Sequence, residues 1–380
     1  MLYIKLSLIV ITCALLPLYL FIRKYKGASP KHKIMYFTAL ITFITFDLIV
    51  FGAFTRLTDS GLGCPDWPGC FAKSNPFSAD YHIDIAEKLS PNGAVTSMKA
   101  WIEMIHRYIA AMVGFLIIIL NILVFKYRKQ LVIKPYHTLI ILGLILLQGA
   151  FGAWTVTLKL QPIIVSTHLV LAIIFILSIF SLYCIQKNNY MTNTNISNSD
   201  NFSSIDTYRN LIILGIALVA LQICLGAWVS SNYAMLGCTE FPTCISGKYI
   251  PQVSKIHWEQ AFHMWRELGL THHGDILSFN SLTVIHFVHR CMALIVFISL
   301  CLIYAKIYFN FIKFSDAKSQ KICKLIKVSF IILLLQITTG ISTVLLSIPI
   351  ATGLVHSAGA TLLIGSLLYI YWQLHYYNKS

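Results

Sequence analysis

The chain has 380 residues, of which 57% are hydrophobic and only 11% are charged, and its formal net charge is +15. This composition favours a protein built into a membrane and excludes an ordinary water-soluble domain. The positive charge does not indicate a nucleic-acid partner, because Lys and Arg gather in alternate loops, at about 23–33, 126–134 and 313–324. That alternation is typical of loops that stay in the cytoplasm.

Nine apolar segments are long enough to cross a bilayer, and each is expected to be a helix because lipid offers no hydrogen bonds to an unpaired backbone. They cover residues about 3–22, 36–56, 101–125, 135–157, 163–186, 210–231, 282–308, 325–347 and 350–373. With the basic loops inside, we expect a multi-pass protein of a bacterial inner membrane, its N-terminus in the periplasm and its C-terminus in the cytoplasm.

The first segment, with the basic loop that follows it to residue 33, is predicted to be a retained helix at the edge of the fold. A cleaved signal peptide would carry its basic cluster before the apolar run. Here the strong cluster follows the run, and no Ala-x-Ala cleavage site is present.

The remainder of the chain consists of two similar halves, an internal duplication. The tetrapeptides at 51–54 (FGAF) and 225–228 (LGAW) each run into a loop with two cysteines, and both cysteines of the second pair lie 174 residues after their counterparts. Each half holds four spans, so the second half runs parallel to the first. We therefore predict an all-α membrane protein with two tandem, pseudo-symmetric four-helix transmembrane bundles. They cover 34–187 and 209–380, joined by a polar cytoplasmic linker over 188–208 and preceded by the N-terminal transmembrane helix of 1–33.

The cysteine pairs are Cys64 with Cys70 and Cys238 with Cys244. Both lie in loops expected outside the cytoplasm, where disulfides persist. A small disulfide loop is therefore expected in each half. It acts either as a staple that fixes the outer loop over the bundle, or in redox exchange or haem delivery.

Four histidines recur at matched places, His106 and His168 in the first half and His289 and His356 in the second. Each lies a turn or two inside the outer end of its predicted span, so the two of one half can face one another. Ionisable residues inside membrane spans are costly and usually functional. Two imidazoles in an apolar bundle suit the axial positions of a haem iron better than a zinc site with three or four ligands.

One position distinguishes the halves. Glu103 lies one helical turn before His106 and on the same face, where the second half has His286. A carboxylate in one of two similar pockets could carry a proton or stabilise a cationic intermediate. The alternative is a glutamate at the membrane surface, where the start of a helix favours negative charge.

Three arginines are candidates for binding the propionates of a haem, because guanidinium groups pair well with carboxylates. Arg107 and Arg290 directly follow a histidine of the repeat, and Arg56 lies near the outer end of its span. Snorkelling toward the membrane surface would also explain Arg56.

The stretch from Gly52 to Cys70 closely resembles the haem A synthase family, as do Glu103-x-x-His106-Arg107 and the second cysteine pair. The resemblance spans residues about 36–374, and the extra first helix departs from the family's basic eight-helix plan. It implies an enzyme that oxidises the C8 methyl of haem O to a formyl group, giving haem A for terminal oxidases.

The resemblance also implies a role for each site residue. A resident haem b in the second half would have His289 and His356 as axial ligands. In the first half, His106 and His168 would lie near the iron of the substrate haem O, with Glu103 beside the reacting methyl.

The family further implies a functional Cys64–Cys70 disulfide. Its implied partners are the haem O synthase that supplies the substrate, an electron acceptor of unknown identity reached through haem b, and further copies of the chain in a homo-oligomer.

Two other functions also fit paired histidines in apolar bundles, namely a di-haem cytochrome b for electron transfer and a haem carrier. A cytochrome of that kind would place its two haems at opposite membrane faces, whereas all four histidines here are expected near the outer face. An enzyme is favoured over a carrier because only one half has the acid Glu103.

Overall fold

The structure is a computed structural model that describes residues 2–91, 93–192 and 205–377. Over these residues the chain forms helices joined by loops, with isolated β-bridges and no strand. The predicted all-α class is therefore confirmed. The chain divides into two compact units, unit 1 (Met1–Gln186) and unit 2 (Lys187–Ser380).

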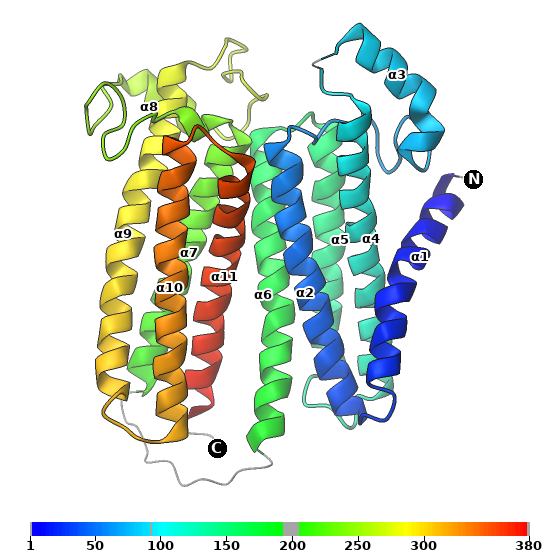
Figure 1. Ribbon diagram of the computed structural model, residues 1–380, viewed down its shortest axis with the longest axis vertical. Helices are drawn as coiled ribbons and strands as arrows, with labels where there is room; N and C mark the ends of the chain where they lie inside the picture. Colours follow the sequence, from blue (N-terminus) through cyan, green and yellow to red (C-terminus); the bar gives the residue numbers. More distant parts are fainter. Residues whose placement is uncertain (1, 92, 193–204, 378–380) are drawn as a thin grey trace. The chain divides into compact units, whose positions relative to one another are not determined.

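Unit 1 is a bundle in which α2 and α5 pack against α4, and α1 packs against α4 at the edge of the unit (Figure 1). Its core is an apolar cluster that includes Phe37 of α2, Leu116 of α4 and Ile179 of α6. The helical elements are α1 (Leu2–Lys24), α2 (Pro30–Leu57), the short 3-10 turn η1 (Pro76–Ala79), α3 (Asp80–Leu89), α4 (Ser97–Lys126), α5 (Pro135–Thr157) and α6 (Pro162–Thr192).

Unit 2 repeats this arrangement, since α7 packs against both α9 and α11, and α10 packs against both α9 and α11 (Figure 1). These contacts close a ring of four helices in which helices that follow one another along the chain run antiparallel. The helical elements are α7 (Ile205–Ser231), the 3-10 turn η2 (Ala234–Leu236), α8 (Lys255–Phe262), α9 (Phe279–Phe311), α10 (Ala317–Leu345) and α11 (Ile350–His375).

Nine of the described helices are long and apolar enough to cross a membrane, and they correspond one to one with the nine predicted spans. The largest difference is at the start of α10, which begins at Ala317 and not near residue 325. Asp316 explains it, because its Oδ1 accepts hydrogen bonds from the N–H groups of Lys318 (3.0 Å) and Ser319 (2.9 Å). This cap starts the helix two polar turns before the apolar pattern begins.

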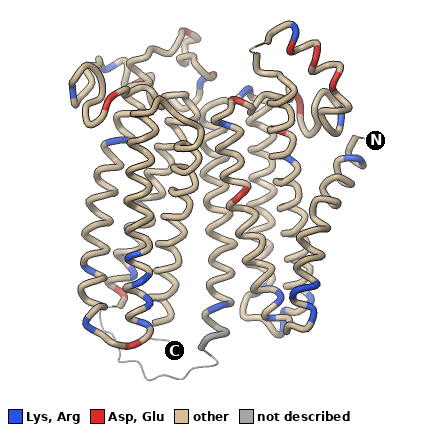
Figure 2. The backbone as a smooth tube through the Cα atoms, in the orientation of Figure 1, with Lys and Arg blue, Asp and Glu red and all other residues tan. Residues whose placement is uncertain are grey.

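Each unit has a loop end and a basic end. The loop end carries residues 58–96, with α3, in unit 1, and residues 232–278, with α8, in unit 2. Lys and Arg residues are concentrated at the opposite, basic end of each unit (Figure 2). In unit 1, α4 and α6 begin at the loop end, and in unit 2, α9 and α11 do the same (Figure 1).

The linker predicted over 188–208 is shorter in the structure. Helix α6 extends to Thr192 and α7 begins at Ile205, so both helices reach into the predicted linker. Residues 193–204 lie outside the described residues.

Candidate functional site

The four repeated histidines lie at the loop ends of their units, each within the first three turns of its helix. His106 of α4 and His168 of α6 are close enough for their imidazoles to interact electrostatically, and the same holds for His289 of α9 and His356 of α11. The structure thus brings the predicted pairs together, one pair in each unit.

Each of these imidazoles lies against a glycine of the preceding long helix. A side chain at that glycine would crowd the imidazole ring. A Cβ added at the glycine would come within 2.9–3.1 Å of the ring's Cε1 atom, closer than nearly all natural Cβ contacts. The pairs are Gly52 with His106, Gly152 with His168, Gly226 with His289 and Gly340 with His356. Four helical hairpins therefore repeat one local geometry, which is a finer repeat than the two halves recognised in the sequence.

Glutamines accompany three of the four histidines. Gln148 and Gln336 each begin a Gln-x-x-x-Gly pattern in the sequence, and both contact their histidine, His168 and His356. Gln222, which the sequence analysis missed, contacts His289 in the same way. The signal that could have revealed it is the same motif, since Gln222 precedes Gly226 by four residues.

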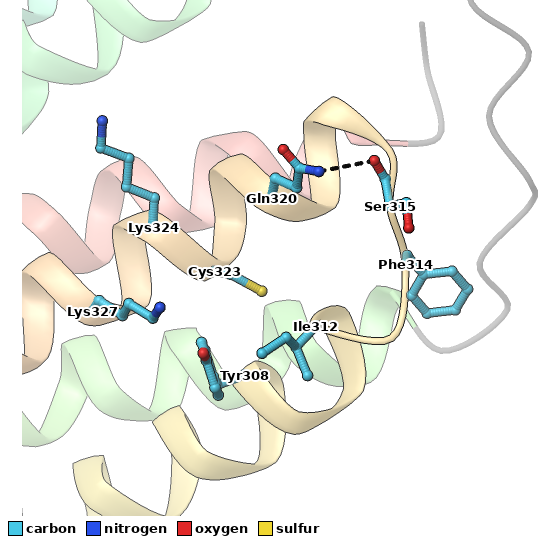
Figure 3. A pocket seen from close by; sticks show the side chains of 8 residues that line it. All are labelled: Tyr308, Ile312, Phe314, Ser315, Gln320, Cys323, Lys324 and Lys327. Atoms are coloured by element: carbon cyan, nitrogen blue, oxygen red, sulfur yellow. Dashed lines mark hydrogen bonds between the residues drawn. The ribbon is translucent and has the colours of Figure 1, made fainter.

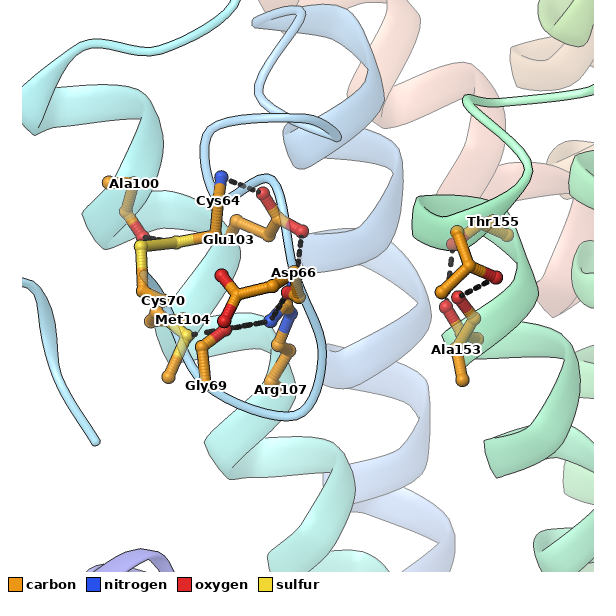
Figure 4. A network of polar contacts seen from close by, with 12 residues as sticks. Cys64, Asp66, Gly69, Cys70, Ala100, Glu103, Met104, Arg107, Ala153 and Thr155 are labelled. Carbon is orange, nitrogen blue, oxygen red and sulfur yellow. Dashed lines mark hydrogen bonds and ion pairs between the residues drawn. A yellow bond between two sulfur atoms is a disulfide. The ribbon is translucent and has the colours of Figure 1, made fainter. Parts of the chain in front are cut away.

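Glu103 is buried, with 4% of its surface exposed, and its carboxylate links α4 to the first cysteine loop (Figure 4). One oxygen accepts a hydrogen bond from the Cys64 N–H at 2.8 Å, and the other forms an ion pair with Arg107. The alternative of a glutamate facing water at the membrane surface is therefore wrong for this side chain.

His286 occupies in unit 2 the place that Glu103 has in unit 1. It is 5% exposed, and its Nδ1 accepts a hydrogen bond from the Cys238 N–H at 3.1 Å. The two residues thus hold equivalent loops by equivalent bonds. The difference between the units is the carboxylate itself, because only Glu103 supplies a negative charge and an acid of carboxylic type at this point.

Arg107 and Arg290 both bind the cysteine loop of their own unit. Arg107 donates from Nη1 to the carbonyls of Asp66 (2.8 Å) and Gly69 (2.5 Å). Arg290 donates to the carbonyls of Glu240 (2.9 Å) and Thr243 (3.1 Å). Both guanidinium groups therefore have a structural task in addition to the propionate binding that was predicted from the sequence.

Arg56 lies in the last turn of α2, at the loop end of unit 1. Its position agrees with the loop end being near a membrane surface, as snorkelling requires. Its predicted role toward a propionate stays a prediction.

Both predicted disulfides are present, and all four sulfur-bearing residues are buried. Cys64 is bonded to Cys70, and Cys238 to Cys244. In unit 1 the disulfide lies in a small apolar cluster with Ala100 and Met104 of α4. The disulfide therefore fixes the segment whose backbone N–H binds Glu103.

Each cysteine loop also contains a carboxylate that accepts hydrogen bonds from other residues of the same loop. In unit 2, Glu240 accepts hydrogen bonds from the Thr243 hydroxyl (2.7 Å) and the Gly247 N–H (2.9 Å). The Thr243 hydrogen bond in particular holds the pKa of Glu240 below its usual value. In unit 1, Asp66 accepts from the N–H groups of Phe71 and Ala72 at 2.6 and 2.7 Å.

Replacing both Cys64 and Cys70 by Ser is expected to destabilise the first loop by about 2 kcal/mol, the entropic value for a ring this small. Limited proteolysis of the loop should become roughly 30-fold faster, because cleavage follows the population of the opened loop. The Cys238→Ser/Cys244→Ser variant is the matched control, since its first loop should be cleaved at the wild-type rate. Equal cleavage of the first loop in all three proteins would contradict the prediction.

The donor set of each unit fits a haem. Among the described residues, no group of three or more His, Cys, Asp and Glu side chains could hold a metal ion together. Each unit instead offers two imidazoles, which is the number of axial positions on a haem iron. In unit 1 the Nδ1 atoms of His106 and His168 are buried without a hydrogen-bond partner, as expected of nitrogens reserved for a bound group.

The described residues also enclose hollows outside the histidine pairs. One, of about 410 Å³, is at the turn between α9 and α10 and is lined by Tyr308, Cys323 and Lys327 (Figure 3). Along α9 it is roughly 28 Å from His289, at the other end of the unit. The second, of about 480 Å³, lies between α1 and α4 and includes Val10 and Arg107. Helix α1 therefore lies beside the Arg107 side of the site, although it is outside the repeat.

Comparison with known proteins gives a consistent result. The COX15-CtaA family model, described as cytochrome oxidase assembly protein, matches residues 35–368. A haem A synthase of Shewanella oneidensis is 34% identical over 88% of this chain and 95% of its own length. Similar proteins under the same name occur in Orientia tsutsugamushi, at 29% identity over 87% of this chain and 92% of the relative, and in Bacillus mycoides, at 26% over 87% and 90%.

Proposed function

Because the chain belongs to the COX15-CtaA family of cytochrome oxidase assembly proteins and to the haem A synthases, we propose that it oxidises the C8 methyl of haem O to the formyl group of haem A. The protein is a multi-pass membrane protein and an enzyme of haem A biosynthesis.

The observation that carries this proposal is a carboxylate that accompanies only one of the two histidine pairs. Both units present a pair of imidazoles against glycines, but only unit 1 has a glutamate, Glu103, one turn before its histidine. We assign the substrate haem O to unit 1, with His106 and His168 beside its iron. Unit 2 holds haem b, with His289 and His356 as axial ligands.

The haem iron supplies the oxidising chemistry when it is bound, and the protein contributes position and charge. Oxidation of the methyl to a formyl group with water as the oxygen donor removes electrons, which would pass through haem b to an external acceptor, and releases protons, which Glu103 would accept. Its geometry is fixed by the Cys64 N–H and by Arg107, which hold the carboxylate on the face of α4 that carries His106. Arg107 also balances the negative charge of Glu103 before a proton arrives.

We place the loop ends of both units on the periplasmic side of a bacterial inner membrane. The basic ends, where Lys and Arg gather, then lie in the cytoplasm, in accordance with the positive-inside rule (Figure 2). This orientation puts both disulfides in an oxidising compartment. We further propose that haem O synthase delivers the substrate from the membrane and that the chain forms homo-oligomers.

Pigment analysis of the purified protein tests the proposed reaction. Haem O and haem A together with haem b are expected after acid extraction and separation. Haem b alone, at two per chain, would overturn the proposal and indicate an electron-transfer cytochrome. Haem b with haem O and no haem A, even after incubation with an oxidant, would indicate a haem carrier.

The glycine beside His168 provides a prediction for unit 1. Gly152→Ala is expected to push the imidazole by a few tenths of an ångström, because the new Cβ would lie 3.1 Å from Cε1. Displacing an iron ligand to this extent should weaken haem O binding by about 10-fold, measured by titration of the protein with haem O.

Gly149→Ala on the same helix is the matched control, since a Cβ there meets nothing within 4 Å. Haem O binding should be unchanged in this variant. Equal haem O affinity in Gly152→Ala and Gly149→Ala would show that the close approach of Gly152 does not set the position of His168.

A further inference from the structure

Three of the four repeated histidines have a glutamine amide lying against them from the neighbouring long helix. In each case the glutamine precedes, by four residues, the glycine that contacts the same imidazole. The pairs are Gln148 with His168, Gln222 with His289 and Gln336 with His356. Glycine and amide thus form one local support, with one helical turn between them.

The amides contact the ring and, in two cases, the backbone of the same histidine. Nε2 of Gln148 lies 3.4 Å from Nε2 of His168 and donates to the carbonyl of that residue at 3.0 Å. Nε2 of Gln222 lies 3.1 Å from Nδ1 of His289 and donates to its carbonyl at 3.1 Å. A side chain bound to both ring and backbone restricts how the imidazole can turn.

A second observation points to the same role. The Oε1 atoms of Gln148, Gln222 and Gln336 are all buried without a hydrogen-bond partner. An imidazole that binds iron through one nitrogen carries its proton on the other, and that N–H needs an acceptor. A half turn of the side-chain amide exchanges the positions of its oxygen and nitrogen. Each Oε1 that lacks a partner can therefore accept the hydrogen bond from the imidazole N–H.

His106 is the exception. The residue four positions before its glycine, Gly52, is Leu48, which packs into the apolar core of unit 1. The His106 ring stacks on Phe51, with centroids 6.2 Å apart, and its Nδ1 is buried without a partner. This imidazole therefore has a glycine and an aromatic ring beside it but no amide.

We propose that Gln148, Gln222 and Gln336 are positioning residues for the iron-binding histidines. His106, which has Leu48 where the other histidines have a glutamine, is then the ligand that releases haem. The inference rests on the proposed function, in which unit 1 exchanges substrate for product and unit 2 keeps its haem. Loss of a partner of this kind lowers metal affinity by about 10- to 100-fold. In unit 2 a glutamine amide supports each of the two histidines, so this unit retains haem b. In unit 1 an amide supports only His168, so this unit can exchange its haem substrate for product.

The test adds the missing amide. Leu48→Gln, loaded with haem O in detergent, should transfer that haem to apomyoglobin at least about 10-fold more slowly than the wild-type protein. Its low-spin electron paramagnetic resonance signal should also shift, because a hydrogen bond to the second ring nitrogen changes the ligand's basicity. Leu40→Gln, two turns away on α2 and packed against the same apolar cluster, controls for the cost of a buried amide.

The reverse substitution tests unit 2. Gln222→Leu should lose haem b to apomyoglobin about 10-fold faster than the wild-type protein. Unchanged loss in Gln222→Leu would overturn the positioning role of the glutamines. A transfer rate and resonance signal in Leu48→Gln that match those of wild type or Leu40→Gln would overturn the assignment of His106, whatever Gln222→Leu does.

Different results would overturn the proposed reaction and the proposed role of the amides. If the pigment analysis finds haem b in both units and no haem O or haem A, the proposed reaction is wrong. The same transfer measurements with haem b in both units then still decide whether the amides hold the histidines, and whether the pocket with Leu48 releases its haem first.

Leu48→Gln is tested for folding by its helical circular dichroism. If it does not fold, the Gln222→Leu measurement decides whether the glutamines position the histidines, and the wild-type transfer rates from the two units decide whether His106 releases haem. Slower release from unit 1 than from unit 2 would overturn that assignment.

Discussion

Glu103→Gln is expected to lower the yield of haem A by about 100-fold or more, with haem O accumulating in the protein. Removing a proton-accepting group from a reaction that releases protons typically costs this much in rate. The substituted amide keeps the shape of the side chain, and its oxygen can still accept the hydrogen bond from Cys64 N–H. The change therefore removes charge and basicity while leaving the contact to the disulfide loop in place. Haem extraction from cells that also make haem O measures the result.

A structural effect of Glu103→Gln has to be separated from a chemical one. Arg107 would lose its ion-pair partner, and with only 12% of its side chain exposed this costs up to about 3 kcal/mol. Arg107 keeps its bonds to the carbonyls of Asp66 and Gly69, so the loop should stay in place. The haem O content of the variant reports on binding and should remain close to wild type, whereas its thermal unfolding temperature should fall in proportion to the lost ion pair.

His286→Gln is the matched control, because His286 makes the same contact to the loop of unit 2. This variant should still form haem A. A haem A yield in Glu103→Gln equal to that of wild type would refute a catalytic role for the carboxylate. A lower yield accompanied by loss of haem O binding would indicate that Glu103 supports the pocket and does not take part in the reaction.

The double variant His289→Ala/His356→Ala is expected to lose haem b from unit 2 and keep the capacity of unit 1 to bind haem O. Both proposed axial ligands are removed, so haem affinity should fall by at least about 100-fold, beyond the effect of losing a supporting hydrogen bond. The low-spin signal of a bis-imidazole iron should vanish from the optical and electron paramagnetic resonance spectra. Haem A formation should stop as well, since the resident cofactor is gone.

His263→Ala/His272→Ala is the control for this double variant. These two histidines belong to the loop of unit 2, where their rings stack at 4.2 Å, and neither belongs to the repeated set. Haem b content should match that of wild type. A fully loaded low-spin iron centre in His289→Ala/His356→Ala would refute the assignment of these residues as ligands.

Much of the site could be predicted because the sequence is duplicated. A single histidine in an apolar helix is often a core residue, but four at matched places in two halves are not easily explained by packing. The position of Glu103 relative to His106 follows from helical periodicity alone. The supports were harder to predict. Gln222 lies 67 residues before His289, so the spacing of 20 residues that links the other two glutamines to their histidines gave no indication of it.

The contacts of the two arginines could not be predicted from the sequence either. A guanidinium group next to a candidate haem ligand suggests a propionate partner, yet Arg107 and Arg290 both bind backbone carbonyls of the cysteine loops. Those carbonyls lie 38 to 50 residues away in sequence, and no local pattern marks them as acceptors. The short helices α3 and α8 were missed for a related reason, since they lie in polar loops where the hydropathy pattern carries little signal.

The sequence by itself determined the number of spans, the duplication and the residue types of the two pockets. These follow from rules that act within a segment, because lipid requires every crossing to be a helix and helical periodicity fixes which neighbours share a face. Only the tertiary structure decided what each side chain touches. The glycines beside the imidazoles, the amides that hold three of them and the bond from Cys64 to Glu103 all join different segments. Their contacts depend on how helices pack, and hydrophobic periodicity does not encode that register.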